Sequence, residues 1–347
     1  MPIIDPKIFD NPALVESAYR QGHILGAITP DNPNERIAKM AKYEIDKLIQ
    51  DDPNYRFGDK ADSDIYGDYE GKLCLGWHAA KHIDVLTGKE RQKQGDCVSM
   101  GKRTAIDQTR CNEIAAGEPE SYKHRGATAL VYSTRQWSGE GMNSLSAARG
   151  VIKNGLLLEL PYESDDGDKL DFSDYEKYWT IGRDYHHDRM PAWLKEQTKP
   201  FGPKSMGIIR TDEELLRALW NGYGVTGGSM LGIDKRGGHQ GVKWLQRPKG
   251  QWPHEMGILG FDARRKYSKD IIVMGDQSWG IWSYVKSTDF PEEYQPVTEG
   301  MWTLTLSDFM RYAVRPGSFQ AFSNTNGFKA QRLPDFGVPE NLFGTSA

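Results

Sequence analysis

Cysteine is scarce in this chain, and long hydrophobic runs are missing. The three cysteines among 347 residues, Cys74, Cys97 and Cys111, are an odd and sparse set, which argues against a disulfide scaffold and leaves reduced thiols. No apolar run approaches the roughly 20 residues that a membrane-spanning helix needs. The first residues, Met1 to Pro6, lack the basic start and apolar core of a secretory signal. We therefore expect a protein of the cytoplasm or of a larger assembly, with no membrane span.

A surplus of charge of one sign is missing as well. The sequence has 44 Lys+Arg and 48 Asp+Glu, a net charge of −4, so nothing global would displace counterions from a phosphate backbone. This balance argues against nucleic acid as the principal partner. Residues 1–90 hold 11 Lys+Arg and 16 Asp+Glu, a net of −5, and this asymmetry sets the acidic front of the chain apart.

Three patterns that often bind cofactors are present only in part. The G-x-G-x-x-G string at 222–227 follows an expected helix and precedes an expected strand, the reverse of the dinucleotide-binding context. The acidic stretch at 62–73 ends in leucine where a calcium loop needs a bidentate glutamate. Cys74, His78 and His82 have helical spacing and are interpreted as a half-buried helix face, within an expected helix over 73–85. We expect neither a cofactor nor a metal.

Helical periodicity dominates the first part of the chain after the acidic front, and short apolar runs dominate the second. Capping and stop signals predict helices over 97–116 and 143–154 and from residue 211. Strands are predicted at 256–261, 271–274, 281–285 and 301–306. Helices followed by strands favour an α+β chain with a helical lobe and a sheet or barrel lobe.

A cysteine at the start of the long predicted helix is the first candidate for chemistry. The helix amino terminus offers partial positive charge and unpaired amide groups, which favour the thiolate of Cys97. Gln92 and Gln94 lie just upstream, so a side-chain amide could join the Cys97 backbone N–H as a second donor. Two such donors form an oxyanion hole.

A histidine far along the chain is the matching candidate base. His254 opens a predicted strand, and histidine is the usual proton acceptor for a cysteine nucleophile. After the apolar run at 271–274, the carboxylate of Asp276 or the amide of Gln277 could orient the imidazole. The neighbouring Trp279 could shield that hydrogen bond from water.

These residues form an ordered set that resembles the papain-like cysteine peptidases. Gln-Gly-Asp-Cys at 94–97 resembles the nucleophile segment, and His254 before an apolar strand is similar to the histidine segment. Gln-Ser-Trp-Gly at 277–280 is similar to the family's Asn-Ser-Trp-Gly, and Gly139-Glu-Gly141 to its glycine-rich substrate loop. The resemblance covers about residues 89–305. It implies a papain-like two-lobed fold, with a helical lobe and an antiparallel β-barrel-like lobe, and substrate binding at Gly139, Gly141 and Trp279.

The sequence departs from the family pattern at the glutamine. In the family this residue precedes the cysteine by six positions, whereas Gln92 and Gln94 precede Cys97 by five and three, so the oxyanion donor stays a choice between the two. In addition, Gln277 replaces the orienting asparagine with one more methylene.

A second register changes the nucleophile itself. It aligns Cys97 with the family's earlier, structural cysteine, places Met100 at the nucleophile and implies an inactive enzyme. We prefer Cys97, because residues 98–101 then resemble the small and apolar first turn of the family's helix. Glu255 follows the histidine where the family usually has a small residue, which would alter substrate access.

The length of the chain exceeds the region of resemblance. We expect an acidic accessory or docking region over 1–88, which lacks the helical signature of an inhibitory prosegment, a peptidase domain over 89–320 and a surface tail over 321–347. The missing secretory signal and the unusual termini look more like papain-like proteins of bacteriophages than like lysosomal or secreted enzymes. The host cytoplasm or the virion is the expected location, with capsid or tail proteins as partners of residues 1–88.

The resemblance implies a thiol peptidase acting on polypeptides. Cys97 would attack the peptide carbonyl, His254 would carry the proton, Gln277 or Asp276 would orient it, and Gln92 or Gln94 would stabilise the oxyanion. Two alternatives stay open. One is a catalytically inactive papain-like structural protein of a virus particle, and the other is an amidase that acts on peptidoglycan.

Overall fold

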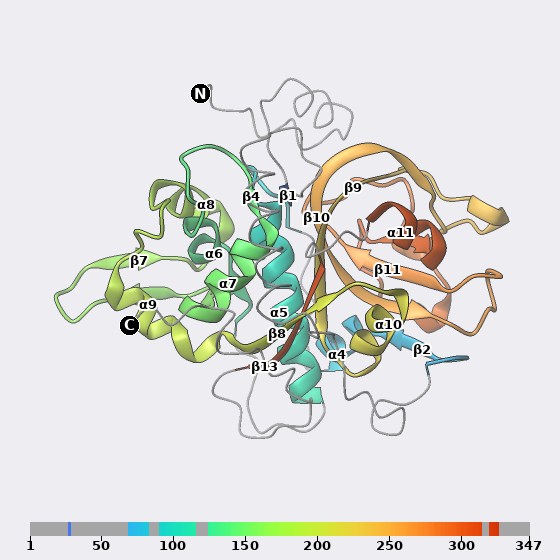
Figure 1. Cartoon of the computed structure of the whole chain (residues 1–347), viewed down its shortest axis with the longest axis horizontal. Helices are drawn as coiled ribbons and strands as arrows, with labels where there is room; N and C mark the ends of the chain where they lie inside the picture. Colours follow the sequence, from blue (N-terminus) through green and yellow to red (C-terminus); the bar gives the residue numbers. More distant parts are fainter. Residues whose placement is uncertain (1–26, 29–68, 83–89, 116–123, 314–318, 326–347) are drawn as a thin grey trace.

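Two lobes lie on either side of one long helix, α5 (Cys97–Ala115). The computed structural model describes residues 27–28, 69–82, 90–115, 124–313 and 319–325. One lobe consists mainly of helices, and the other is built on an antiparallel sheet (Figure 1). The predicted α+β class, with a helical lobe and an antiparallel sheet lobe, is confirmed. The acidic stretch at 62–68 lies outside the described residues, as does most of the predicted accessory region.

The helices begin and end largely where local signals place them. Asn143 caps α7 by accepting a hydrogen bond from the Ser146 N–H, and Thr211 caps α10 in a capping box with Glu214. The helices of the described residues are α4 (Trp77–His82), α5, α6 (Ala129–Ser133), α7 (Ser144–Asn154), α8 (Tyr175–Asp184), α9 (Ala192–Thr198), α10 (Asp212–Trp220) and α11 (Leu306–Ala313), with 3-10 turns at Lys199–Phe201, His239–Gly241, Ser287–Asp289 and Glu292–Tyr294.

The main sheet has the strand order β12-β11-β10-β9-β13-β8, with β2 also paired to β10. Its pairs are antiparallel. These strands are β2 (Leu73–Leu75), β8 (Pro203–Ile209), β9 (Gly224–Ile233), β10 (Pro248–Asp262), β11 (Ile272–Asp276), β12 (Trp302–Thr305) and β13 (Phe319–Thr325). Short pairs are formed by β1 (Ala27–Ile28) with β4 (Met142–Asn143), β3 (Gly126–Ala127) with β5 (Leu157–Leu158), and β6 (Pro161–Glu163) with β7 (Lys169–Asp171).

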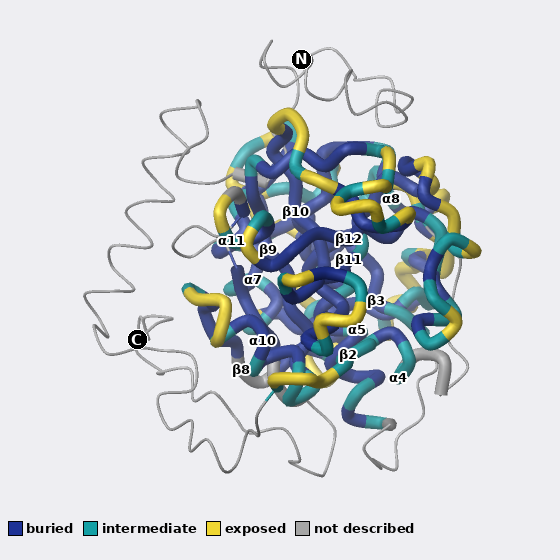
Figure 2. Tube along the Cα trace, turned by 90° about the vertical axis from the view of Figure 1, so that its right-hand side faces the viewer, coloured by how far each residue is buried: buried dark blue, intermediate teal, exposed yellow. Residues whose placement is uncertain are grey.

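The long strand β10 is packed directly against α5. A side chain at Gly101 of α5 would place its Cβ 2.5 Å from Thr226 Oγ1 and 2.9 Å from Glu255 Cγ, so only glycine allows this approach. Figure 2 shows β9, β10 and α5 as largely buried. The first turns of α5 therefore lie against the part of β10 that contains His254.

Two predicted elements are wrong. Residues 281–285 are a loop, because Trp282 and Val285 are buried whereas Ile281 and Tyr284 are 72% and 70% exposed, which is not the alternation of a strand. The predicted helix over 73–85 is divided into β2 and α4, with residues 83–85 outside the described part. Since Cys74 lies in a strand paired with β10, it does not share a helix face with His78.

The predicted surface tail begins inside a buried strand. β13 lies between β9 and β8, and Ala321 and Phe322 are fully buried. The expectation of a surface tail is therefore wrong for Ala321 and Phe322, because their buried apolar side chains complete the sheet. Residues 326–347 lie outside the described part.

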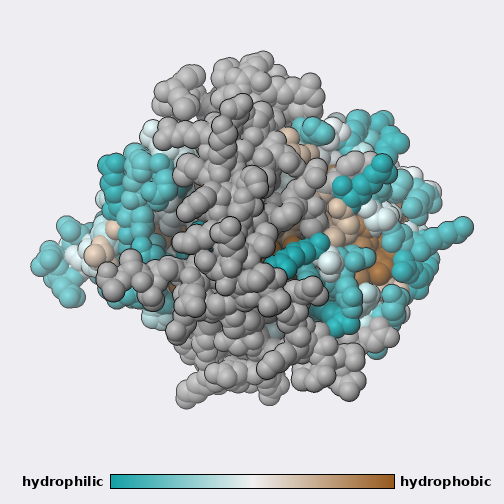
Figure 3. Space-filling model, in the orientation of Figure 1, coloured by the Kyte–Doolittle hydropathy of each residue, from teal (hydrophilic) through white to brown (hydrophobic). Residues whose placement is uncertain are grey.

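The surface seen in Figure 3 is mostly hydrophilic over the described residues, with a hydrophobic area on the sheet lobe. Among the helices of the described residues, none combines the length and the hydrophobicity needed to cross a bilayer.

Candidate active site

Cys97 lies at the boundary between the lobes. It is the first residue of α5 and 1% exposed. Its thiol approaches two backbone N–H groups, those of Val98 and of Glu255 on β10. Burial raises the thiol pKa far above its ordinary value, and the two N–H groups oppose this shift only in part. In this form of the protein, Cys97 carries a neutral thiol.

Met100 is the residue that the second register places at the nucleophile, and its side chain lies in the core of the helical lobe. There it is buried and packs with Leu130, Phe172 and Tyr178. Cys97, in contrast, contacts the residue that follows His254. The geometry thus brings the cysteine to the histidine strand.

His254 is enclosed by Trp279. The imidazole stacks on the indole with ring centroids 4.1 Å apart and planes inclined by 28°. Burial lowers the His254 pKa to about 3, and the nearby Gln277 amide opposes this shift. Neither His254 Nε2 nor Gln277 Nε2 completes a well-aligned hydrogen bond, so the amide lies beside the ring without being fully engaged. The imidazole is therefore neutral at ordinary pH.

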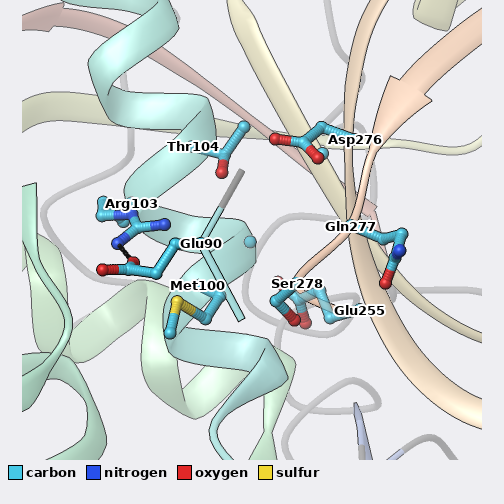
Figure 4. Close-up of a pocket in the computed structure, with 10 residues that line it drawn as sticks. Glu90, Met100, Arg103, Thr104, Glu255, Asp276, Gln277 and Ser278 are labelled. Carbon is cyan, nitrogen blue, oxygen red and sulfur yellow. Dashed lines mark hydrogen bonds and ion pairs between the residues drawn. The ribbon is translucent and has the colours of Figure 1, made fainter. Parts of the chain in front are cut away.

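The two candidate orienting residues point in opposite directions. Asp276 points toward Thr104 on α5, whereas Gln277 points away from α5, as expected for neighbouring residues at the end of a strand (Figure 4). Gln277 Oε1 accepts a hydrogen bond of 2.7 Å from the Trp279 backbone N–H. Gln277 is thus the one held beside the stacked imidazole and indole.

The two candidate oxyanion donors also separate. The Gln92 N–H donates to the Ser278 carbonyl at 2.7 Å, and its side-chain oxygen accepts from the Ser278 hydroxyl. Gln92 Nε2 donates to the Gln94 carbonyl at 2.7 Å, which leaves one N–H of this amide for another acceptor. Gln94 Nε2 instead donates to the Trp179 carbonyl on α8. The structure places Gln92 beside the histidine and tryptophan segment, and Gln94 in the helical lobe.

The predicted substrate loop lies beside the nucleophile segment. The Gly95 N–H donates to the Glu140 carboxylate, and a Cβ at Gly95 would be 2.7 Å from the Gly141 nitrogen. The Gly139 carbonyl accepts from Arg135 Nε at 3.0 Å, which holds the first glycine of the loop. Gly141 therefore lies beside Gly95, two residues before Cys97, and Gly139 is held by Arg135.

A piece of the acidic front lies at this same edge. Ala27 and Ile28 form β1, which pairs in parallel with Met142 and Asn143 of β4. β1 also approaches β9 and β10, and Figure 1 shows it between the two lobes. With Cys97 and His254 exposed by only 1% and 2%, the structure shows a closed site.

Sequence reasoning missed the roles of three ionisable side chains near the nucleophile. Lys102 and Glu255 form an ion pair of 2.5 Å with both side chains fully buried. Asp96, buried next to Cys97, accepts from the Tyr175 hydroxyl at 3.0 Å, and burial raises its pKa to about 7. The available signal is a charged residue inside an apolar strand or helix pattern, and at Glu255 the sequence predicts only altered substrate access.

A small pocket lies beneath the site, between α5, the middle of β10 and the end of β11. Thr104 and Met100 line it from the helix, and Glu255, Asp276 and Ser278 line it from the sheet (Figure 4). Within the described ranges, no group of three or more His, Cys, Asp or Glu side chains could hold a metal ion.

The solved structures to which this chain is similar include cysteine proteases. No protein-family model and no curated protein matches the chain. Among solved structures, proCathepsin B S9 from Trypanosoma congolense aligns at 9% identity over 90% of this chain and 96% of its own, with a TM-score of 0.49. Xylellain, a cysteine protease from Xylella fastidiosa, aligns at 12% identity over 69% of this chain and 83% of its own, with a TM-score of 0.43. The proform of the ragweed pollen cysteine protease Amb a 11 aligns at 14% identity over 92% and 95%, with a TM-score of 0.45.

Proposed function

We propose that this chain is a papain-like thiol hydrolase that cleaves peptide bonds, with Cys97 as nucleophile and His254 as proton acceptor. One observation carries the proposal: the Cys97 thiol, at the start of α5, contacts the backbone N–H of Glu255, the residue after His254. A thiol at a helix amino terminus close to a histidine strand is the arrangement that cysteine nucleophiles use.

The reaction follows from these positions. Cys97 transfers its proton to His254 and attacks the carbonyl carbon of the substrate amide. We assign the oxyanion to the Cys97 backbone N–H and to the remaining N–H of Gln92. His254 then protonates the departing amine, a thioester remains, and a water molecule that His254 deprotonates hydrolyses it. Trp279 and Gln277 hold the imidazole during both steps.

The closed site must open before substrate can enter. While it is closed, burial keeps the thiol protonated and the imidazole unprotonated. Hydration on opening removes the desolvation that causes both shifts, so proton transfer from Cys97 to His254 becomes easier. The closed form is therefore a resting form of the proposed enzyme.

A polypeptide is the substrate class that the site favours. The edge of β4, a few residues from Gly95 and Cys97, already pairs with the extended backbone of Ala27 and Ile28. Main-chain pairing of this kind binds a peptide without demanding a particular side chain. A peptidoglycan amide is the alternative substrate, and it is tested by offering purified cell wall in place of protein.

The proposal is tested by hydrolysis of fluorescent casein by the full chain. We expect turnover that falls at least a thousandfold in Cys97→Ser and in His254→Ala. Cys111→Ser removes another buried thiol from the same helix and is expected to retain activity. Turnover that survives Cys97→Ser would overturn the proposal.

A catalytically inactive papain-like protein is the second candidate. The observation that favours it is the neutral, buried state of both Cys97 and His254 in the closed site. It predicts no turnover on casein or cell wall and no preferential reactivity of Cys97. A phage origin, location in the host cytoplasm or virion, and docking of capsid or tail proteins through residues 1–88 rest on the sequence resemblance, and co-purification with phage particles tests them.

A further inference from the structure

A buried ion pair joins the two lobes directly beneath the candidate nucleophile. Lys102 Nζ lies 2.5 Å from Glu255 Oε1, and both side chains are fully buried. Lys102 lies on α5, five residues after Cys97, and Glu255 follows His254 on β10. The pair therefore links α5 and β10, the same two elements that carry Cys97 and His254.

The pair is held by directional bonds from three further elements. Lys102 Nζ also donates to Ser144 Oγ of α7 at 2.9 Å and to Gln320 Oε1 of β13. Glu255 Oε1 also accepts from Thr226 Oγ1 of β9 at 3.0 Å. Such bonds fix the position of β10 along α5 more narrowly than apolar contacts would, because they are directional.

Stability alone does not account for two buried charges. Taking both ions out of water is costly, and apolar side chains of similar size often hold such an interface equally well. The charges also act on the thiol: Glu255 raises the Cys97 pKa, and Lys102 interacts electrostatically with Cys97. Together they leave little net charge beside the nucleophile.

We propose that Lys102 and Glu255 are positioning residues, which hold the first turns of α5 against the histidine strand and cancel each other's charge beside Cys97. The inference rests on the proposed function, since it concerns the reactivity of the same thiol. The further ionisable group that acts on Cys97 is Asp96, which has Glu140 next to it, and His254 precedes Glu255 on β10. None of these is altered by changing the pair.

The test is the rate of Cys97 alkylation by iodoacetamide in the full chain, followed from pH 5 to pH 10. Glu255→Gln removes the carboxylate that raises the Cys97 pKa, so Cys97 reacts at least threefold faster and its pH midpoint falls. Lys102→Met leaves the Glu255 carboxylate unopposed, so the rate falls at least threefold and the midpoint rises. One pKa unit corresponds to about threefold in rate, because the tenfold change in thiolate is partly offset by nucleophilicity. The double variant, with neither charge, returns toward the original midpoint.

Loosening of the fold is separated from the charge effect by Cys111 in the same sample. Cys111 also lies on α5, so a loosened variant would react faster at both thiols without a shift of midpoint at Cys97. Lys177→Met, which breaks an exposed ion pair with Asp171, is the matched control and leaves the Cys97 profile unchanged. Midpoints that move in the same direction in both single variants, or that do not move, would overturn the inference. Failure of the proposed function looks different, because casein turnover would then survive Cys97→Ser whatever the two midpoints do.

Discussion

The buried carboxyl group of Asp96 makes the free energy of unfolding depend on pH. Burial raises its pKa to about 7, so between about pH 4 and pH 7 the folded chain keeps a proton that the unfolded chain releases. Its contribution to stability is present below pH 4 and is lost as the pH rises through 7. Asp96→Asn removes this loss, and we expect the variant to gain a few kcal/mol over the original chain between pH 4.5 and pH 8.

Urea unfolding of Asp96→Asn and of the original chain at pH 4.5 and pH 8 measures the difference in their free energies of unfolding. His254, whose lowered pKa destabilises the fold in the opposite direction as the pH falls from about 6.5 toward 3, is common to both chains and cancels. Asp165→Asn changes an exposed carboxylate in the turn between β6 and β7 and is the control. A difference that does not change with pH would show that Asp96 is not protonated in the fold.

The side chains of Gln92 and Gln94 point to different partners, so we expect their alanine variants to differ in activity. Gln92→Ala removes the side-chain donor assigned to the oxyanion, so kcat on casein is expected to fall about 10²–10³-fold. Gln94→Ala removes a bond to α8 and is expected to change kcat far less. Equal losses in the two variants would contradict the assignment of Gln92.

At the residue scale, the sequence could nominate Cys97 and His254 by residue type and order, but it could not choose between paired candidates. Gln92 and Gln94 are both buried, and their roles differ only because one meets Ser278 and the other Trp179. Lys102 and Glu255 are 153 residues apart, so nothing local marks them as partners.

At the element scale, β13 is the strand whose loss should be most damaging. It lies between β9 and β8, Phe322 is fully buried, and the Thr109 hydroxyl donates to the Phe322 carbonyl at 3.0 Å. A chain that ends after residue 320 is therefore expected to lose cooperative unfolding, since Phe322 alone contributes about 3–5 kcal/mol. A chain that ends after residue 325 keeps β13 and is the control in thermal unfolding by circular dichroism. Equal stability of the two chains would contradict the role of β13.

Elements with local signals were predictable, and elements made by distant pairing were not. The ends of α7 and α10 follow from their capping residues, Asn143 and Thr211. β2 and β13 were not predicted, because neither has a long alternating apolar pattern. Each is a strand because it pairs with strands far along the chain. The loop at 281–285 was predicted as a strand because its composition is apolar. Its exposed residues, Ile281 and Tyr284, are three positions apart, whereas a strand exposes every second residue.

At the scale of the whole molecule, the order of helices and strands was enough to predict two lobes, but not what covers the boundary between them. β1 contributes only two residues, and its partner β4 is equally short, so no periodic signal reveals the contact. The closed site follows from this pairing and from the near-complete burial of Cys97 and His254.

Weakening β1 should open the site. Proline lacks the backbone N–H that strand pairing uses, so Ala27→Pro with Ile28→Pro breaks the pairing with β4. We expect Cys97 alkylation to become at least tenfold faster, because opening removes the burial that raises its pKa. Ala27→Ser with Ile28→Val keeps both N–H groups and should leave the rate unchanged. If the proline variant reacts like this control, β1 does not close the site.

The central claim, that Cys97 and His254 form an activated pair, is tested most directly by mapping where iodoacetamide reacts at pH 6. Cys74 is more exposed than Cys97, and Cys111 shares its helix, so both are internal references. We expect that in the double proline variant, whose site is open, Cys97 reacts at least tenfold faster than either, and that adding His254→Ala to this variant abolishes the preference. Labelling of Cys97 no faster than Cys74 or Cys111 in the double proline variant would show that Cys97 and His254 do not form an activated pair.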